Sequence, residues 1–210
     1  SILAQAQNTF DGLWWIKARK SDTVFNNHQL VDSVRGQVSG NWQALYSNET
    51  DPNSNYIAPG LDCVAWCWNG GGAAVTNNDG SIESQVSANT DAGFSIITYT
   101  GNGSGAPATV GHGLTKPPEF MIVSFRDTGA NRSVYHKDVG NKRRLLLNSD
   151  LKQSDESNLY WNNQSPGTDV FTLGASLNQA TAFDYAAYAW HSVPGYSAFG
   201  SYQGNGDPSG

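Results

Sequence analysis

Short runs in which apolar side chains alternate with small or polar ones dominate the chain, and they predict β-strands. Along Cys63–Trp68 the small residues would share one face and the three bulky residues the other, which is the period of two of an extended strand. Tyr185–Trp190 repeats this alternation, and large aromatics at matching positions are typical of a core. Further strands are predicted at residues 94–100, 120–125, 144–147 and 170–173.

The segments between these runs are typical of turns, and no window shows a sustained helical period with caps. Gly-Asn, Pro-Pro and Pro-Gly pairs separate the strands, and Asn77–Gly80 predicts a tight hairpin turn. Glycine, serine, asparagine and threonine make up 78 of the 210 residues, and these residue types favour turns over helices. We therefore predict an all-β fold, an antiparallel β-sandwich of a jelly-roll-like kind.

The chain is similar to itself at an offset of about 100 residues, which indicates an internal repeat. Leu13–Arg19 aligns with Phe120–Arg126 at an offset of 107, and both are strand-like runs closed by arginine. The later matches are 30–36 with 134–140 at 104, 45–48 with 145–148 at 100, 64–68 with 186–190 at 122, and 99–103 with 202–206 at 103. The jump to 122 indicates that the first copy lacks a counterpart of Tyr160–Leu173.

This repeat divides the chain into two related units of roughly 100 residues. The predicted first unit is 1–92, shortened between 49 and 62, and the predicted second unit is 93–210. The start of a third unit is predicted at 195–210. We therefore expect the chain to be part of a longer array of such units.

Charge and hydropathy exclude two classes of partner. The chain carries 12 Lys and Arg against 18 Asp and Glu, and its basic run is confined to Lys142–Arg144, which is too little positive charge to neutralise a track of phosphates. The longest apolar stretches are far shorter than the ~20 residues that cross a bilayer. We therefore expect neither nucleic acid nor a membrane as a partner.

The sequence shows no strong pattern of a metal, cofactor or catalytic site. An extended segment holds Cys63 and Cys67 too far apart to form a disulfide with each other, and we expect both to be small core residues. His112 is expected in a turn and His136 at a strand edge. The acidic residues lack the paired pattern of a glycosidase, and the G-x-S-x-G elbow is absent. We predict a protein that is not an enzyme and that binds no cofactor and no metal.

Two polar segments that contain tryptophan remain as candidates for ligand contact. Tyr160, Trp161, Asn162 and Asn163 follow one another in the segment that the first copy lacks, and Trp42 stands in an Asn-Trp-Gln run. Aromatic rings offer flat apolar faces to sugar rings, and side-chain amides offer hydrogen bonds to hydroxyls. Alternatively, both tryptophans cover the core from a loop, and the residues alone leave this choice open.

Four longer motifs carry a resemblance to a known family. They are F-D-G-L-W-W-I-K-A-R at Phe10–Arg19, H-Q-L-V-D-S-V-R-G at His28–Gly36, N-T-D-A-G-F-S-I-I-T-Y-T-G-N-G at Asn89–Gly103 and G-Y-S-A-F-G-S-Y-Q-G-N-G at Gly195–Gly206. With these motifs the chain resembles, over nearly its whole length, a repeat-built module of tail-fibre and related virion proteins of tailed phages, especially marine and cyanobacterial ones. The resemblance implies a virion structural or host-recognition protein in a very long chain, often next to concanavalin-A-like lectin domains. It implies no catalytic residues.

From the resemblance and the residues together, we expect a domain of a phage tail fibre or other virion appendage that acts in host-surface adhesion. The expected ligand is a host cell-surface glycan, the expected partners are other virion proteins and further copies of the chain in a homo-trimer, and the expected location is the virion. The alternative is a purely structural spacer or decoration domain without a ligand. A third alternative, a polysaccharide depolymerase, would need two acidic side chains about 5 to 10 Å apart in a cleft.

Overall fold

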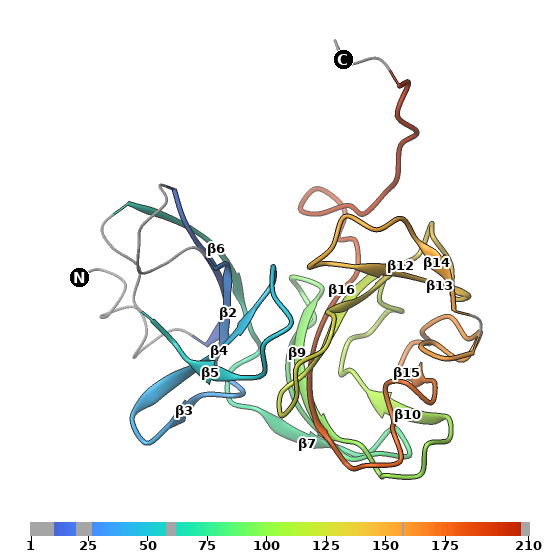
Figure 1. Ribbon diagram of the computed structural model, residues 1–210, viewed down its shortest axis with the longest axis horizontal. Coiled ribbons are helices and arrows are strands. Elements are labelled where there is room, and N and C mark those ends of the chain that lie inside the picture. The colour runs from blue at the N-terminus through green and yellow to red at the C-terminus, as the bar shows by residue number, and fades with distance from the viewer. Residues whose placement is uncertain (1–10, 20–26, 58–61, 157, 207–210) are drawn as a thin grey trace.

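The computed structural model describes residues 11–19, 27–57, 62–156 and 158–206, which form an all-β structure built mainly of antiparallel sheets. No helix occurs within these ranges. Two large sheets pack face to face, and a small third sheet covers the far face of the second one (Figure 1). The predicted all-β fold of the sandwich type is therefore confirmed.

The first large sheet, called sheet 1, has six strands. They are β1 (Gly12–Ala18), β2 (Gln29–Asp32), β3 (Gln37–Val38), β4 (Asn41–Tyr46), β5 (Ser54–Asn55) and β6 (Cys63–Asn69). Their order is β3-β4-β2-β1-β6, and β5 pairs with β4. β6 is therefore an edge strand, which pairs with β1 on one side and with no described strand on the other.

The second large sheet, called sheet 2, has eight strands in the order β14-β13-β12-β11-β16-β9-β8-β7. The strands are β7 (Val75–Asn77), β8 (Ser84–Asn89), β9 (Phe94–Thr100), β11 (Phe120–Phe125), β12 (Ser133–His136), β13 (Arg143–Leu146), β14 (Ser154–Asp155) and β16 (Asp184–Trp190). The strand predictions at 94–100 and 120–125 are confirmed with the same bounds, and those at 144–147 and 185–190 are off by one residue. β16 lies inside the sheet, between β11 and β9.

The hairpin predicted at Asn77–Gly80 exists but has a longer loop. Asn77 pairs with Ser84, so the loop spans residues 78–83. The loop is longer than a tight turn and contacts a neighbouring segment, where Ile82 donates its backbone N–H to the carbonyl of Thr109, at 3.0 Å. The loop therefore contacts β10 (Ala108–Gly111), which forms the small two-stranded sheet with β15 (Val170–Leu173).

Sheets 1 and 2 share a strand order and a register. The order β5-β4-β2-β1-β6 in sheet 1 corresponds to β14-β13-β12-β11-β16 in sheet 2. Leu13 pairs with Trp68, and Phe120 pairs with Trp190 at the sequence offsets of 107 and 122. The pairs β2–β4 and β4–β5 recur as β12–β13 and β13–β14 at offsets of 104 and 100. The unit boundary at residue 92 stays a prediction, and it falls inside sheet 2, between β8 and β9.

The turn after the second of these strands is also alike in the two sheets. The Asp32 carboxylate accepts the backbone N–H two residues further on at 3.0 Å, and Nδ1 of His136 does the same at 3.2 Å. Gly36 and Gly140, with φ of 59° and 88°, donate their N–H groups to the carbonyls of residues 32 and 136. The position requires a hydrogen-bond acceptor in the side chain, which explains why aspartate and histidine both occur there.

Three hydrophobic clusters follow from the layers. The first lies between sheets 1 and 2 and contains Leu13, Leu30, Leu45, Ile122 and Tyr188. A larger cluster lies between sheet 2 and the small sheet, and a smaller one on the outer face of sheet 1. Sheet 2 is thus buried on both faces, whereas on the outer face of sheet 1 the described residues form a small core of four buried side chains.

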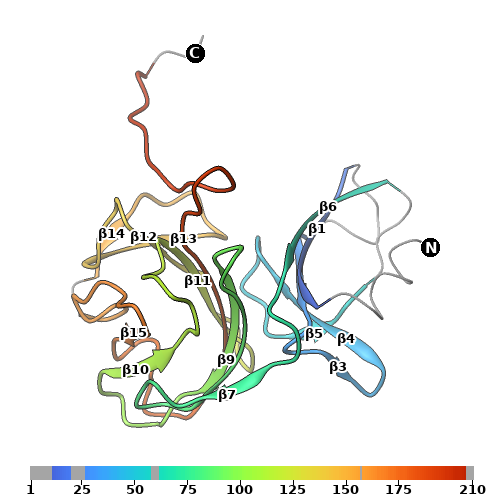
Figure 2. The same cartoon turned by 180° about the vertical axis from the view of Figure 1, so that it is seen from behind.

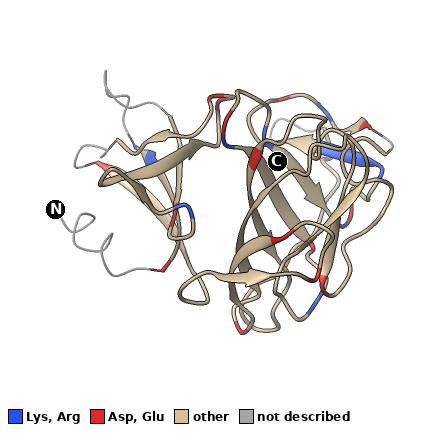
Figure 3. Cartoon of the chain, turned by 90° about the horizontal axis from the view of Figure 1, so that it is seen from below, with Lys and Arg blue, Asp and Glu red and all other residues tan. Residues whose placement is uncertain are grey.

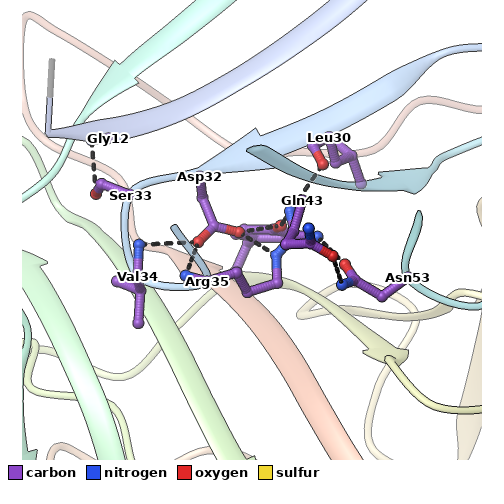
Figure 4. Close-up of polar contacts among 9 residues, drawn as sticks. Gly12, Leu30, Asp32, Ser33, Val34, Arg35, Gln43 and Asn53 are labelled. Atoms are coloured by element: carbon purple, nitrogen blue, oxygen red, sulfur yellow. Dashed lines mark hydrogen bonds and ion pairs between the residues drawn. The ribbon is translucent and has the colours of Figure 1, made fainter. Parts of the chain in front are cut away.

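A buried ion pair at the end of β2, on sheet 1, is hydrogen-bonded to sheet 2 (Figure 4). Nε of Arg35 lies 2.5 Å from Oδ2 of Asp32, and neither side chain is exposed. The same carboxylate accepts a hydrogen bond at 2.7 Å from the hydroxyl of Tyr188 on β16, and the guanidinium donates to that hydroxyl at 2.9 Å. The guanidinium also donates to the carbonyl of Leu30 and to Oδ1 of Asn53. All charge in this site is therefore compensated within the protein.

A second buried arginine connects the sheets through backbone carbonyls. Arg132 precedes β12 and donates to the carbonyls of Tyr46 and Asp51, at 2.9 and 2.5 Å. Burial lowers the pKa of Arg132 to about 10, and Arg35 nearby acts in the same direction. Two cations therefore stand at the interface between the sheets, and Asp32 pairs with one of them.

The buried ion pair of Asp32 and Arg35 gives a first testable prediction. Replacing Arg35 by methionine is expected to lower the free energy of unfolding by about 3–5 kcal/mol, because it leaves the Asp32 carboxylate buried without a counter-ion. The double variant Asp32→Asn/Arg35→Met removes both charges and is expected to be more stable than Arg35→Met alone. Urea denaturation followed by tryptophan fluorescence measures both, and equal stability of the two variants would contradict this account.

Buried tyrosines give a second prediction, for alkaline pH. Burial raises the pKa of Tyr185 to about 12 and raises the pKa of Tyr99 and Tyr188 well above its ordinary value. Above about pH 10 the tyrosines of the unfolded chain lose their protons while the folded ones retain them, so stability falls as pH rises, by about 1.4 kcal/mol per pH unit for each tyrosine. Denaturation at pH 8 to 11 measures the slope, which Tyr185→Phe is expected to reduce. A stability that stays constant over this range would refute the prediction.

Candidate binding surface

The most exposed aromatic cluster of the described residues lies on β1 and β6, which run side by side in Figure 2. Trp15 and Trp66 are direct cross-strand partners, and their rings meet edge to face with centroids 6.3 Å apart. Together with Trp68 they line a pocket of about 290 Å³. Trp66 is 49% exposed, so one wall of the pocket presents its ring to solvent.

The two other tryptophans of the pocket are held in place. Nε1 of Trp15 donates a hydrogen bond to the hydroxyl of Ser47 at 2.9 Å. Trp68 packs against Phe94 and Trp190 of sheet 2, with ring centroids 6.3 and 5.6 Å away. The pocket therefore has two fixed aromatic walls and an exposed third one, and its lining carries no charge. Such a surface suits flat, neutral ligands with apolar faces.

The exposure of Trp66 corrects the expectation that the aromatics of this segment belong to the core. Its counterpart in sheet 2 is Tyr188, which is buried because β9 flanks β16 and places Ile96 beside the ring. On β6 the corresponding edge has no described strand. The alternation predicted correctly that Trp66 and Trp68 share a face, but it carries no information on which strands flank them.

Trp161, the main candidate from the sequence, is 2% exposed. Its indole N–H donates to the carbonyl of Arg143 at 3.0 Å, and its ring packs edge to face on Tyr135, with centroids 5.7 Å apart. The residue belongs to the cluster between sheet 2 and the small sheet. The ring of Trp161 therefore covers the core from its loop and offers no face to a ligand.

The neighbours of Trp161 form a turn at the surface. The ring of Tyr160 is half-buried under the guanidinium of Arg144, which lies 3.7 Å from the ring centroid. Asn162 and Asn163 adopt left-handed backbone conformations, with φ of 50° and 55°. Asparagine tolerates this region better than most residues, so these side chains have a sufficient structural role in reversing the chain.

Trp42 is half-buried on the outer face of sheet 1, where its ring packs edge to face on Trp14 at 5.5 Å. Trp161 belongs to a different cluster, on the far side of sheet 2. The structure therefore does not bring Trp42 and Trp161 together in one groove.

The cysteines and histidines of the sequence analysis differ in their surroundings. Both cysteines are free, but Cys67 is exposed, so the expectation that it is a core residue is wrong. It stands on the open edge strand β6, where β16 has the buried Ala189. His112 is buried, and its Nδ1 accepts the backbone N–H of Leu114 while Nε2 contacts the carbonyl of Gly167. Burial lowers the pKa of His112, so it serves the turn as a neutral residue.

Acidic side chains with described partners are engaged in structural contacts. Glu119 accepts hydrogen bonds from Lys137 and Ser192, at 2.8 and 2.5 Å. Burial opposes its ionisation, but these two contacts outweigh burial and lower the pKa of Glu119. No group of three or more His, Cys, Asp or Glu side chains among the described residues could hold a metal ion.

Charge is sparse over the fold, and Figure 3 shows lysine, arginine, aspartate and glutamate at scattered positions on a mostly uncharged ribbon. In the parts that the structure describes, no helix is long and apolar enough to cross a membrane. The uncharged pocket of Trp15, Trp66 and Trp68 is thus the clearest candidate for ligand contact.

Comparison with protein families gives one match. The family described as "Domain of unknown function (DUF7483)" matches residues 47–210. This range contains β5, β6, all of sheet 2 and the small sheet, while β1 to β4 precede it. No curated protein and no solved structure matches the chain.

The contrast between two tryptophans gives a third prediction. Trp161→Ala is expected to lower the free energy of unfolding by about 3–5 kcal/mol, because it leaves a cavity in the largest core and an unpaired carbonyl at Arg143. Trp66→Ala is expected to cost about 1 kcal/mol or less, because half of its ring is already in water. Thermal and urea denaturation of the two variants measure the difference. A larger loss for Trp66→Ala would contradict the assignment of core and surface.

Proposed function

The chain belongs to the DUF7483 family of domains of unknown function, and we propose that it is a non-catalytic adhesion module of a phage tail fibre or related virion appendage. In this proposal it binds a glycan of the host surface. The virion and the host come from the resemblance of the four sequence motifs to the tail-fibre module. Binding is supported by one structural observation, the open pocket of Trp15, Trp66 and Trp68.

The physical chemistry of this pocket favours a neutral saccharide. Sugar rings have apolar faces of C–H groups that stack on aromatic rings, and the half-exposed ring of Trp66 is positioned for such a contact. Trp15 and Trp68 are already ordered by Ser47 and by Trp190, so binding would fix few side chains and cost little conformational entropy. The net charge of -6 at pH 7 favours a neutral ligand over a polyanionic one.

The other partners of the proposal rest on the resemblance. They are other virion proteins and further copies of the chain in a homo-trimer, with the assembled virion as the location. A purely structural spacer or decoration domain is the second candidate, and the burial of Trp161 and the packing of Trp42 on Trp14 favour it. Both candidates are non-catalytic. A depolymerase has less support, because Glu119 and Glu156 are held in ion pairs with Lys137 and Arg144.

A glycan array tests the proposal and gives a fourth prediction. The wild-type protein is screened against host-envelope polysaccharides, and the affinity for any bound glycan is compared with that of Trp66→Ala. Removal of one stacking ring costs about 1.4 kcal/mol or more, so affinity is expected to fall at least about tenfold. Tyr196→Ala removes another exposed aromatic side chain, 68% exposed against 49% for Trp66, that does not line the pocket, and is the matched control.

The outcomes separate the two candidate functions. Saturable binding that is lost in Trp66→Ala and retained in Tyr196→Ala supports recognition at the pocket. Binding that Trp66→Ala leaves unchanged would move the ligand to another surface. A folded wild-type protein that binds no glycan on the array would leave the spacer as the better account.

A further inference from the structure

No described strand lies beside the outer edge of β6, whereas the corresponding edge in sheet 2 has one. β16 corresponds to β6, and it pairs along its whole length with β9, from Asp184 opposite Thr100 to Trp190 opposite Phe94. Among the described residues, β6 pairs with β1 only. The backbone N–H and C=O groups that face outward from an unpaired edge strand form a template for a further strand.

Side-chain exposure on the two strands reflects this difference. Every residue of β16 after Asp184 is buried. In β6 no residue is buried to that degree, and Trp66, Cys67 and Asn69 are exposed. Apart from Asn69 and Asp184 at their ends, both strands consist of apolar and aromatic residues. β6 therefore has the composition of an interior strand and the surroundings of an edge strand.

One segment of the chain shares a motif with the end of β9. Tyr99–Gly103, which ends β9 and begins the following loop, recurs as Tyr202–Gly206 at an offset of 103. The residues that correspond to β9 at this offset are 197–203, and apart from an isolated bridge between Ser197 and Val193 they are not part of a β-strand. Figures 1 and 2 show the C-terminal segment running away from both sheets. Tyr202 is 94% exposed, although its counterpart Tyr99 is buried in the core.

We propose that the outer edge of β6 binds the segment 197–203 of a second copy of this chain as an added antiparallel strand. The register follows from the pairing of β16 with β9 and from the offsets of 122 and 103. It places Phe199 opposite Trp66, Ala198 opposite Cys67 and Tyr202 opposite Cys63. Copies would then associate head to tail, with the C-terminal segment of one completing sheet 1 of the next.

The chemistry of both partners is compatible with this pairing. Neither β6 nor the run Gly195–Gly206 contains a charged residue, so no like charges meet. Phe199 is half-buried and stacks on Phe120 at 5.7 Å, and on β6 it would exchange this contact for the cross-strand ring of Trp66. A head-to-tail contact of this kind uses two different surfaces and is heterologous, so it can be repeated to form rings or filaments.

The inference rests on a different contact from the proposed glycan ligand, the backbone edge of β6. In the register above, Phe199 would lie beside Trp66, as Ile96 lies beside Tyr188 in sheet 2. An occupied edge would therefore cover part of the Trp66 ring that the glycan would contact. The test below measures covalent linkage between copies, so its result does not depend on whether a glycan binds.

Register-specific disulfide formation tests the proposal. Directly opposed residues of antiparallel strands have Cα atoms about 4.5–5.5 Å apart, within the range that a disulfide spans. Ala198→Cys, made in the Cys63→Ser background, is expected to form an intermolecular disulfide with Cys67. Partial burial raises the pKa of the Cys67 thiol, so oxidation is performed at mildly alkaline pH, where the thiolate is more abundant.

Matched variants keep the result specific to the register. Ser201→Cys, in the same background, places a thiol on the same exposed segment but opposite Val64, on the other face of the strand, and is expected to link much more slowly. Tyr202→Cys in the Cys67→Ser background is expected to link to Cys63. All of these C-terminal positions are at the surface, and thermal unfolding of each reduced variant checks that the fold is retained.

Non-reducing gels and mass spectrometry of the linked peptides decide the outcome. Disulfide-linked dimers and larger species that contain the 198–67 and 202–63 linkages, formed at least about tenfold faster than in Ser201→Cys, support strand addition between copies. Equal rates for the three variants would overturn it. Linkage that stays within a single chain would also overturn it, because the segment would then complete sheet 1 of its own copy.

Discussion

The ion pair of Asp32 and Arg35 is the contact on which the arrangement of the two large sheets depends. Asp32 ends β2 and Arg35 lies in the turn that follows, both on sheet 1, and the hydroxyl that completes their hydrogen bonding belongs to Tyr188, on the central strand β16 of sheet 2. A charge pair without access to water tolerates little displacement, because each lost hydrogen bond leaves a buried group unsatisfied. Apolar side chains of both sheets form the cluster between them, and this polar site fixes how the two faces are aligned.

The position of β16 inside sheet 2 explains why its aromatic side chains are buried, whereas those of the edge strand β6 in sheet 1 are partly exposed. Sheet 2 is covered by sheet 1 on one face and by β10 and β15 on the other, so its strands bury residues of both parities. Within the described residues, sheet 1 has a large partner on one face and ends at β6. Aromatic side chains at corresponding positions are therefore core residues in one sheet and line an open pocket in the other. The difference comes from the neighbouring strand and not from the residues themselves.

The sequence predicted the parts of the structure that depend on local pattern. Alternation located the main strands, because a strand with one apolar face has a period of two in any surroundings. Self-comparison gave the offsets at which the register of sheet 1 recurs in sheet 2. The exposure of Trp66 and the burial of Trp161 could not be predicted, because each depends on a segment distant in the chain: the absence of a described neighbour for β6, and the carbonyl of Arg143 that accepts the indole N–H. The contact of Arg35 with sheet 2 could not be predicted either, because Tyr188 lies 153 residues away in the sequence.

The way the sheets cover each other also has a consequence for fragments of the chain. Leu13, Leu30 and Leu45 of sheet 1 pack against sheet 2, and water would reach each face without the other. A fragment that ended between β6 and β7 would contain sheet 1 without the strands that cover these leucines. A stable fragment of this architecture therefore has to contain strands of both sheets.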